Sequence, residues 1–219
     1  MFNDPIMTNG KKDPVTGFFA KEELLPFLDR ARAAADGSGK PMAVFTFTLD
    51  QLRRSSRWDS TEDLMINFFA SAMRLACPFK DEYAVFVSGS DKYVAVFPGK
   101  ASAQLYRAGK SMERKMLKTP FVWNKWVHKL SFSGGICAFP GDGRDPQELL
   151  DNSERAMNTA IRLGRGRVCQ FSQQWHESLK PYLIPIPVVL LALMFAVFLT
   201  YKPAHKPSQA KPVPVLMRK

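Results

Sequence analysis

YAVFVSGSDKYVAVFPG, residues 83–99 of the chain, contains two runs of β-branched and aromatic residues. The runs flank a small polar turn, Ser88-Gly89-Ser90-Asp91, and this combination predicts a β-hairpin. Because both runs are almost wholly apolar, we expect both faces of the two strands to be buried in a central sheet. A turn at the end of two buried strands is a rigid place to hold a ligand.

The composition indicates one domain of ordinary size and a further stretch of chain outside its core. The chain has 219 residues, 46% of them hydrophobic, and a formal net charge of +11. The last 18 residues, 202–219, hold five basic residues and no acid, which leaves +6 for the rest. This modest excess fits an anionic lipid surface or an anionic nucleotide equally well, and we expect no nucleic acid among the partners.

Three cysteines, Cys77, Cys137 and Cys169, lie in apolar surroundings without CxxC spacing. They predict buried thiols in a reducing compartment and no metal site. Residues 1–12 are polar and carry no secretory signal, so we expect a disordered N-terminus that stays in the cytoplasm.

The chain around the hairpin predicts alternating helices and strands. The segment 13–19 reads DPVTGFF and precedes an amphipathic helix, and residues 42–49 (MAVFTFTL) predict a buried strand. Further helices are expected over 64–77 and 146–164. The predicted buried face of the first helix consists of Leu24, Leu25, Leu28, Ala31 and Ala35, and that of the second of Leu64, Phe68, Ala72 and Leu75.

In this order the segments resemble the GGDEF domain, the catalytic module of bacterial diguanylate cyclases. DPVTGFF is similar to the family's opening Asp-x-Leu-Thr-Gly-Leu, the hairpin to its Gly-Gly-Asp/Glu-Glu-Phe turn, and 165–168 to its closing Gly-Arg-Asn-x-Val. The resemblance covers about 13–173. It implies an α+β sandwich, nucleotidyl cyclase-like, with a central, mainly antiparallel sheet flanked by helices.

The family's signature is altered in this chain. Its five positions are held here by Gly89, Ser90, Asp91, Lys92 and Tyr93. In the family, the two glycines let the backbone approach the nucleotide, the third residue helps to bind magnesium, and the fourth is a second acid. A serine adds a side chain to that approach, and a lysine repels the hard cation that a carboxylate would attract. The resemblance therefore implies a degenerate GGDEF domain.

Other family positions are altered as well. The strand 42–49 leads into the family's Asp-x-Asp-x-Phe-Lys, whose magnesium ligand, neighbouring acid and phosphate-contacting lysine correspond to Thr48, Asp50 and Arg53. Asp63 corresponds to the guanine-contacting Asp or is a helix-start residue. The nucleotide-binding candidates are Asp50, Arg53, Asp63, Asp91 and Lys92.

Two further sites depart from the family. The product-inhibition motif Arg-x-x-Asp falls on Lys80 and Tyr83, so we expect at most a remnant of that site. The family's Tyr and phosphate-contacting Lys in Ala-x-Tyr-x-Ala-Lys are replaced by Asn158 and Ile161. No catalytic residue and no metal ligand are assigned.

Residues 181–201 (PYLIPIPVVLLALMFAVFLTY) contain no charge and match the roughly 20 residues that span a bilayer. They predict a single transmembrane helix, with a buried soluble helix as the alternative. A linker, 174–180, precedes it, and a basic, Pro-rich tail, 202–219, comes after it. We expect the bacterial inner membrane with the domain in the cytoplasm, although the positive-inside rule would place the tail inside as well.

These expectations combine into a catalytically inactive, membrane-anchored GGDEF protein that acts through protein contacts, with a homodimer or another cyclic di-GMP signalling protein as its partner. The alternative is a receptor for GTP or cyclic di-GMP with an altered pocket. An active diguanylate cyclase is the least favoured interpretation. No cofactor is expected, and Mg²⁺ and GTP enter only if one of the alternatives holds.

Overall fold

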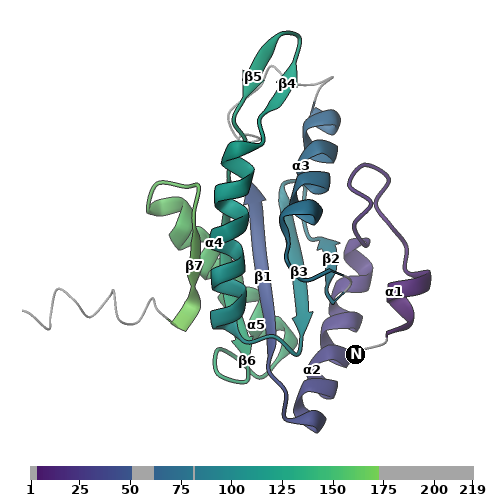
Figure 1. The fold of residues 1–219 in the computed structure, drawn as a ribbon. Helices are drawn as coiled ribbons and strands as arrows, with labels where there is room; N and C mark the ends of the chain where they lie inside the picture. The colour runs from purple at the N-terminus through teal and green to yellow at the C-terminus, as the bar shows by residue number, and fades with distance from the viewer. Residues whose placement is uncertain (1–3, 51–61, 81, 173–219) are drawn as a thin grey trace, which may run out of the picture. The chain divides into compact units, whose positions relative to one another are not determined.

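The computed structural model describes residues 4–50, 62–80 and 82–172 (Figure 1). The chain divides into two compact units, Met1–Glu177 and Ser178–Lys219. Every described residue belongs to the first unit.

The predicted membrane helix is not among the described residues. Within the part of the chain that the structure describes, no helix is long and apolar enough to cross a membrane. The expected linker (174–180), span (181–201) and tail (202–219) lie outside the described residues and remain predictions.

A five-stranded sheet forms the centre of the domain, as the resemblance implied. Neighbouring strands are antiparallel except for the last pair, which is parallel. Across the sheet the order is β2 (Ala84–Val87), β3 (Lys92–Pro98), β1 (Met42–Leu49), β6 (Phe132–Phe139) and β7 (Val168–Gln170).

Helices cover both faces of the sheet (Figure 1). On one face lie α2 (Leu24–Ser38), which comes after a short 3₁₀ turn, Lys21–Glu23, and α5 (Pro146–Arg162). On the other lie α3 (Glu62–Ala76) and α4 (Ser102–Lys118). Outside these layers are α1 (Pro5–Asn9) and a separate hairpin of β4 (Phe121–Trp123) and β5 (Trp126–His128).

Strand β1 is buried at all eight positions because it has a strand on each side and helices on both faces. Alternate residues of a strand point to opposite faces. Accordingly, Phe45 and Phe47 join the core under α3 and α4, whereas Met42 and Val44 join the core under α2 and α5. The even-numbered positions of β1 therefore all face the α2 and α5 layer.

The predicted buried face of α3 was wrong by one residue. Leu64 and Leu75 are exposed, the latter to 86%, whereas the core side consists of Met65, Ile66, Phe69, Ala70, Met73 and Ala76. A shift of one residue turns a helix face by about 100°. Both stripes hold large apolar residues, so spacing alone did not decide between them. On α2 the same prediction held except for Leu25, which is exposed.

The strands of residues 83–99 form the predicted hairpin, but they differ in burial. Strand β3 is buried on both faces, whereas β2 is an edge strand in which buried and half-buried residues alternate. The backbone of Phe19 pairs with the outer side of β2: its N–H donates to Val85 O (2.8 Å) and its carbonyl accepts from Val87 N (2.9 Å). The DPVTGFF segment and the hairpin thus belong to one structural unit.

The N-terminal segment differs from the predicted disorder of residues 1–12. From Asp4 onward it is described, and Pro5–Asn9 form α1. Asp4 is buried and accepts two hydrogen bonds from Arg30 of α2, at 2.7 and 3.1 Å, while Met7 packs against the core under α2. A bidentate arginine contact of this kind is not encoded in local composition.

Helix α5 packs on β6 through a glycine. A Cβ at Gly135 would lie 2.1 Å from Met157 N and 2.1 Å from Ser153 O, both backbone atoms of α5. Gly135→Ala should therefore displace the helix and lower the free energy of unfolding by about 3 kcal/mol or more, measured by urea denaturation.

Gly141→Ala is the matched control, because nothing lies within 4 Å of a Cβ there. It should change the free energy of unfolding by less than about 0.5 kcal/mol. Equal stability of the two variants would contradict the packing described for α5.

Candidate functional site

The candidate site lies where the β2–β3 turn meets the end of β1. Thr48 on β1 is paired across the sheet with Lys92 at the start of β3 and with Ser133 on β6. Since Thr46 and Thr48 have even numbers in β1, both face the layer of α2 and α5, and Asp50 is the first residue after the strand. Polar side chains in a doubly buried strand need partners there, and the three residues differ in whether they have them.

Asp50 is joined to three parts of the fold. Its carboxylate accepts from Ser133 Oγ (2.6 Å), Ser131 Oγ (2.8 Å) and the backbone N–H of Gly166 (3.0 Å), and it is only 6% exposed. The carbonyl oxygen of Asp50 also accepts from Arg165 Nη1 at 3.0 Å. These bonds tie the end of β1 to β6 and to the loop before β7, so the carboxylate is engaged within the fold.

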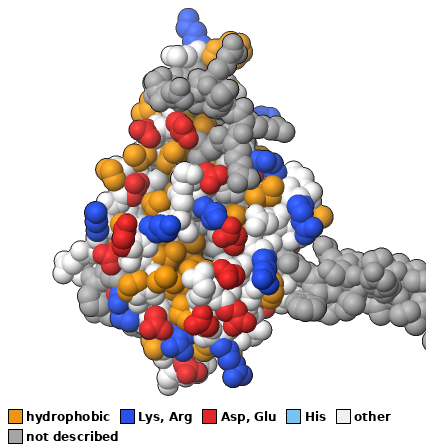
Figure 2. Space-filling model, turned by 180° about the vertical axis from the view of Figure 1, so that it is seen from behind, with side chains coloured by type: hydrophobic (Ala, Val, Ile, Leu, Met, Phe, Trp, Pro, Cys, Tyr) orange, Lys and Arg blue, Asp and Glu red, His pale blue; other side chains and the backbone are white. Residues whose placement is uncertain are grey.

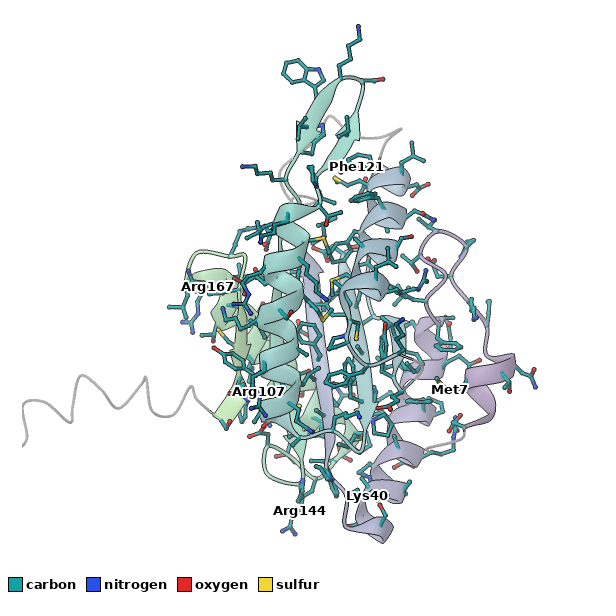
Figure 3. All side chains as sticks on the ribbon, viewed as in Figure 1. Met7, Lys40, Arg107, Phe121, Arg144 and Arg167 are labelled. Atoms are coloured by element: carbon teal, nitrogen blue, oxygen red, sulfur yellow. The ribbon has the colours of Figure 1, made fainter. Side chains whose placement is uncertain are left out.

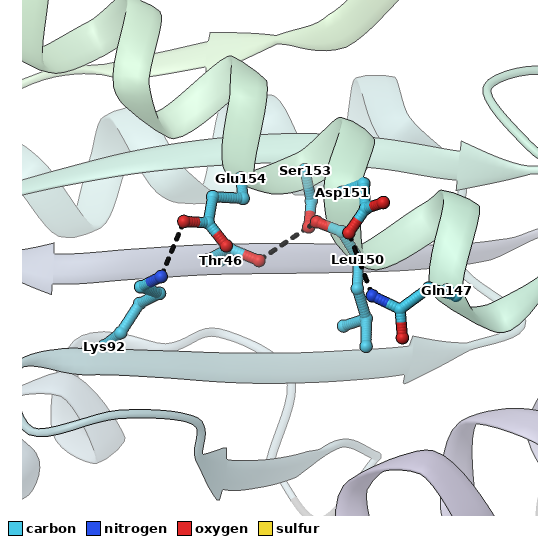
Figure 4. A network of polar contacts seen from close by, with 7 residues as sticks. All are labelled: Thr46, Lys92, Gln147, Leu150, Asp151, Ser153 and Glu154. Carbon is cyan, nitrogen blue, oxygen red and sulfur yellow. Dashed lines mark hydrogen bonds and ion pairs between the residues drawn. The ribbon is translucent and has the colours of Figure 1, made fainter.

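Lys92 forms an ion pair with Glu154 of α5, with 2.5 Å between Nζ and Oε1 (Figure 4). The preceding residue of α5, Ser153, shares a hydrogen bond of 2.6 Å with Thr46. Ser153 donates its hydrogen to Leu150 O (2.8 Å), so the hydroxyl of Thr46 is the donor to Ser153. Both contacts join the sheet to the same side of α5.

Thr48 lies two residues beyond Thr46 on β1, opposite Lys92 of β3. Its hydroxyl is buried and has no hydrogen-bond partner among the described residues. A buried unsatisfied hydroxyl costs about 1–3 kcal/mol. The residue that the resemblance aligns with the family's metal ligand is therefore a neutral group without a hydrogen bond to the described fold.

The turn of the hairpin is closed by Ser88 and Gly89, whose N–H groups both donate to Lys92 O, at 2.8 and 3.1 Å. Gly89 does not adopt the left-handed conformation, and a Cβ there would meet only Lys92 Cβ, at an ordinary 3.5 Å. The local fold thus does not require a glycine at this position. Ser90 is exposed, and Asp91 is half-buried beside it.

Tyr93, which the resemblance aligns with the family's phenylalanine, packs in the core. Its ring is buried, with an edge-on contact to Phe18 (5.6 Å between centroids) and a tilted contact to Phe47 (5.6 Å). Burial raises the pKa of the Tyr93 phenol to about 12. The hydroxyl therefore stays protonated at physiological pH and adds no charge near the turn.

The other predicted nucleotide residues are dispersed. Asp63 is exposed in the first turn of α3, where an acid is favourable near the helix N-terminus. Arg53 lies outside the described residues, as does most of the segment before α3. The structure brings Asp50 and Lys92 to the same end of the sheet, with Asp91 next to Lys92 in the turn, and does not bring Asp63 to them through any described contact.

The two residues of the inhibitory-site remnant have different surroundings. Lys80 is exposed in the loop before β2. Tyr83 stacks on Phe97 with 5.0 Å between ring centroids, and it lines a surface pocket of about 610 Å³ beside Glu82 and Lys100. The tyrosine therefore serves the packing of the sheet.

The comparisons with known proteins agree with this architecture. Residues 11–167, well over half of the chain, match the family described as diguanylate cyclase, GGDEF domain. The fold and the family match place the chain among the nucleotidyl cyclase-like α+β proteins. Within that class it belongs to the GGDEF family and so to the proteins of cyclic di-GMP signalling. No curated protein matches the chain in sequence.

Several solved structures share the fold. The GGDEF domain of FimX from Pseudomonas aeruginosa is 23% identical, with a TM-score of 0.65 over 74% of this chain and 99% of that one. The GGDEF domain of PA1120 (TpbB or YfiN), from the same organism, is 21% identical, with a TM-score of 0.66 over 73% and 94%. The GGDEF domain of DgcB from Caulobacter crescentus, solved with cyclic di-GMP, is 18% identical, with a TM-score of 0.62 over 78% and 96%.

Magnesium, the metal that the family implies, would meet one half-buried signature carboxylate, Asp91, among the described residues of this site. Mg²⁺ binds through carboxylates and phosphate oxygens in octahedral geometry. Here Thr48 is neutral, Lys92 is positive, and the carboxylate of Asp50 already accepts three hydrogen bonds. Over 4–50, 62–80 and 82–172, no three His, Cys, Asp or Glu side chains gather in a way that could hold a metal ion.

Sequence reasoning missed the residues that hold the site together. Ser131, Ser133 and Gly166 come after Asp50 by more than 80 positions, so no local pattern connects them to it. Glu154 was likewise missed as the partner of Lys92. The serine-glycine composition of β6 was the one available signal, because small polar residues in a buried strand indicate a nearby polar group.

Thr48 near the end of β1 and Asp50 just after it should respond to substitution in opposite ways. Asp50→Asn places an amide NH₂ against donors, among them the Gly166 N–H, which cannot turn away. We expect it to lower the free energy of unfolding by about 2–4 kcal/mol in urea denaturation.

Thr48→Val is the matched control, because it removes a hydroxyl that has no partner among the described residues and keeps the shape of the side chain. It should leave stability unchanged or raise it by up to about 1 kcal/mol. If Asp50→Asn were as stable as the parent chain, the carboxylate would not be the structural link described here.

Proposed function

We propose that this GGDEF protein is catalytically inactive and acts through protein contacts, held at the bacterial inner membrane by residues 181–201 with its GGDEF domain in the cytoplasm. The observation that carries the proposal is the ion pair between Lys92 and Glu154 next to the neutral Thr48. Together these residues occupy the positions where the family has two acids and replace them with one hydroxyl and one paired cation.

The physical argument concerns charge. An active cyclase brings together two GTP molecules and needs Mg²⁺ and basic groups to neutralise phosphate charge while each 3′-hydroxyl attacks the other α-phosphate. Such electrostatic stabilisation is usually the largest catalytic contribution. Thr48 removes a metal carboxylate, Lys92 reverses the charge of a signature acid, and Ile161 replaces the phosphate-contacting lysine.

The ion pair matters for its position more than for its strength. The side chains of Lys92 and Glu154 are 31% and 41% exposed, and a pair with this exposure contributes at most about 1 kcal/mol to stability. It holds the ammonium group over the face of β1 that bears Thr48. A metal ion approaching that position would meet a positive charge.

A protein partner fits what is known of one protein with this fold. The diguanylate cyclase SiaD of Pseudomonas aeruginosa was solved in complex with its activator SiaC, with a TM-score of 0.65 to this chain at 15% identity. For the present chain we propose a partner of cyclic di-GMP signalling or a second copy of the chain.

The same lysine supports an alternative function. With 31% of its side chain exposed next to the exposed Ser90, Lys92 is a cation at the turn that could meet a nucleotide phosphate. A receptor for GTP or cyclic di-GMP would use this group without metal chemistry.

We expect no cyclic di-GMP from the purified full-length chain incubated with GTP and Mg²⁺. The reason is that Thr48 offers the metal ion no carboxylate and Ile161 offers the phosphates no positive charge. The product is measured by chromatography, with the active GGEEF domain of a Vibrio cholerae diguanylate cyclase as the positive control. Product formation that is lost in Asp91→Ala would overturn the proposal and establish an active enzyme.

Calorimetric titration of the full-length chain with GTP and with cyclic di-GMP, each with Mg²⁺, separates the two candidate functions. For a protein that acts by protein contacts alone we expect no binding heat with either nucleotide. Micromolar binding that weakens about tenfold in Lys92→Ala, the loss of one charge-assisted contact, would establish the receptor instead. Glu154→Gln is the control, since it frees Lys92 from its ion pair and should not weaken such binding.

A further inference from the structure

The hairpin β4–β5 stands apart from the sheet, beyond the end of α4 (Figure 1). Its strands are paired Phe121 to His128, Val122 to Val127 and Trp123 to Trp126. The two-residue turn, Asn124-Lys125, has positive φ at both positions, 47° and 68°, as a tight hairpin turn requires. The hairpin is therefore a regular two-stranded ribbon that ends in a tight turn.

The base of the hairpin is fixed and its end is uncovered. Phe121, labelled in Figure 3, is buried in the core under α3 and α4, and its ring lies 5.2 Å from that of Phe68 of α3. Beyond it, Val122, Val127 and Trp126 are exposed to 60%, 63% and 73%. Because paired residues share a face and successive pairs alternate, these side chains place apolar surface on both faces of the ribbon.

The charge of this region has one sign. Residues 118–130, KTPFVWNKWVHKL, contain three lysines and one histidine and no acid. Lys118, Lys125 and Lys129 are exposed, and Arg114 and Lys115 continue the basic surface along α4. In Figure 2 basic and apolar side chains are both seen at this end of the molecule.

Lys125 has an unfavourable backbone conformation. A φ of 68° at the second turn position is adopted at least cost by glycine, and a lysine there is strained. Strain that the turn could avoid with a glycine indicates that the side chain has a use at this position. Its ammonium group lies at the tip, next to the exposed Trp126.

We propose that the β4–β5 hairpin is a contact for an anionic membrane surface. Tryptophan is enriched at the boundary between headgroups and acyl chains, valine enters the apolar side of that boundary, and lysines are attracted to anionic headgroups. Exposed tryptophan also occurs in protein interfaces, but here it stands among three lysines with no acid over residues 118–130, a combination that favours an anionic membrane surface. The contact does not require residues 181–201 to span a bilayer.

The test is local, so that it reports on the hairpin whether or not another segment binds the membrane. A nitroxide spin label is attached at Asn124→Cys in the full-length chain, with Cys169→Ser to prevent labelling of the one half-exposed native cysteine. Collisions with a water-soluble nickel complex are measured with vesicles of phosphatidylcholine and phosphatidylserine at 7:3. A label at Arg144→Cys is the control, because that residue lies in the loop at the opposite end of the domain (Figure 3).

We expect the vesicles to shield the label at 124 from nickel and to leave the label at 144 accessible. Replacing both Lys125 and Lys129 by serine should lower the equilibrium constant for docking of the tip on the membrane by about 25-fold, at about fivefold per lysine. Vesicles of phosphatidylcholine alone should shield the label at 124 less than vesicles with phosphatidylserine. High salt should also reduce the shielding by the phosphatidylserine vesicles.

Two outcomes would overturn the proposal. The first is a label at 124 that stays as accessible to nickel with phosphatidylserine vesicles as without them, even when the chain itself sediments with the membrane. The second is shielding that rises with protein concentration in the absence of lipid, which would assign the hairpin to contact with a second copy of the chain. Neither result bears on GTP turnover or nucleotide binding.

Discussion

Burial of β1 on both faces and along both edges is the constraint on which the rest of the domain depends. Its odd-numbered side chains fill one core and its even-numbered ones the other, so Thr46 and Thr48 point toward the layer of α2 and α5, and the polar Asp50 follows at the strand's end. Each must bond to something inside the protein or remain unsatisfied. Thr46 bonds to Ser153, Asp50 joins three segments, and Thr48 has no partner among the described residues.

This distribution separates the structural use of the family's motif from its catalytic use. Asp50 has a position that the fold needs, because it connects β1, β6 and the loop before β7. Thr48 occupies a position that the fold does not need, so its side chain is not fixed by any described hydrogen bond. The described hydrogen bonds of the domain therefore depend on the residue at position 50 and not on the side chain at position 48.

The sequence was sufficient for the parts of the fold that depend on local pattern and order. Nearly continuous apolar runs, with a polar turn in the hairpin, predicted β1 and the hairpin, and the order of the segments predicted the family. What it did not predict depends on contacts between distant residues: the face of α3, the bond between Asp4 and Arg30, and the surroundings of Asp50 and Lys92. In each case local spacing allowed more than one arrangement, and packing against another element selected one.

The pairing of Phe19 with β2 has a consequence for how the chain behaves outside its native setting. The outer side of β2 is a sheet edge, and Phe19 satisfies the backbone groups of Val85 and Val87 there. Phe19 is held at that edge by the turn before it, in which Thr16 donates to Asp13. A shortened chain that begins after this turn would present an open strand edge, which is a template for pairing with other copies. The first residues of the domain thus cover a sheet edge that would otherwise be open to pairing with another strand.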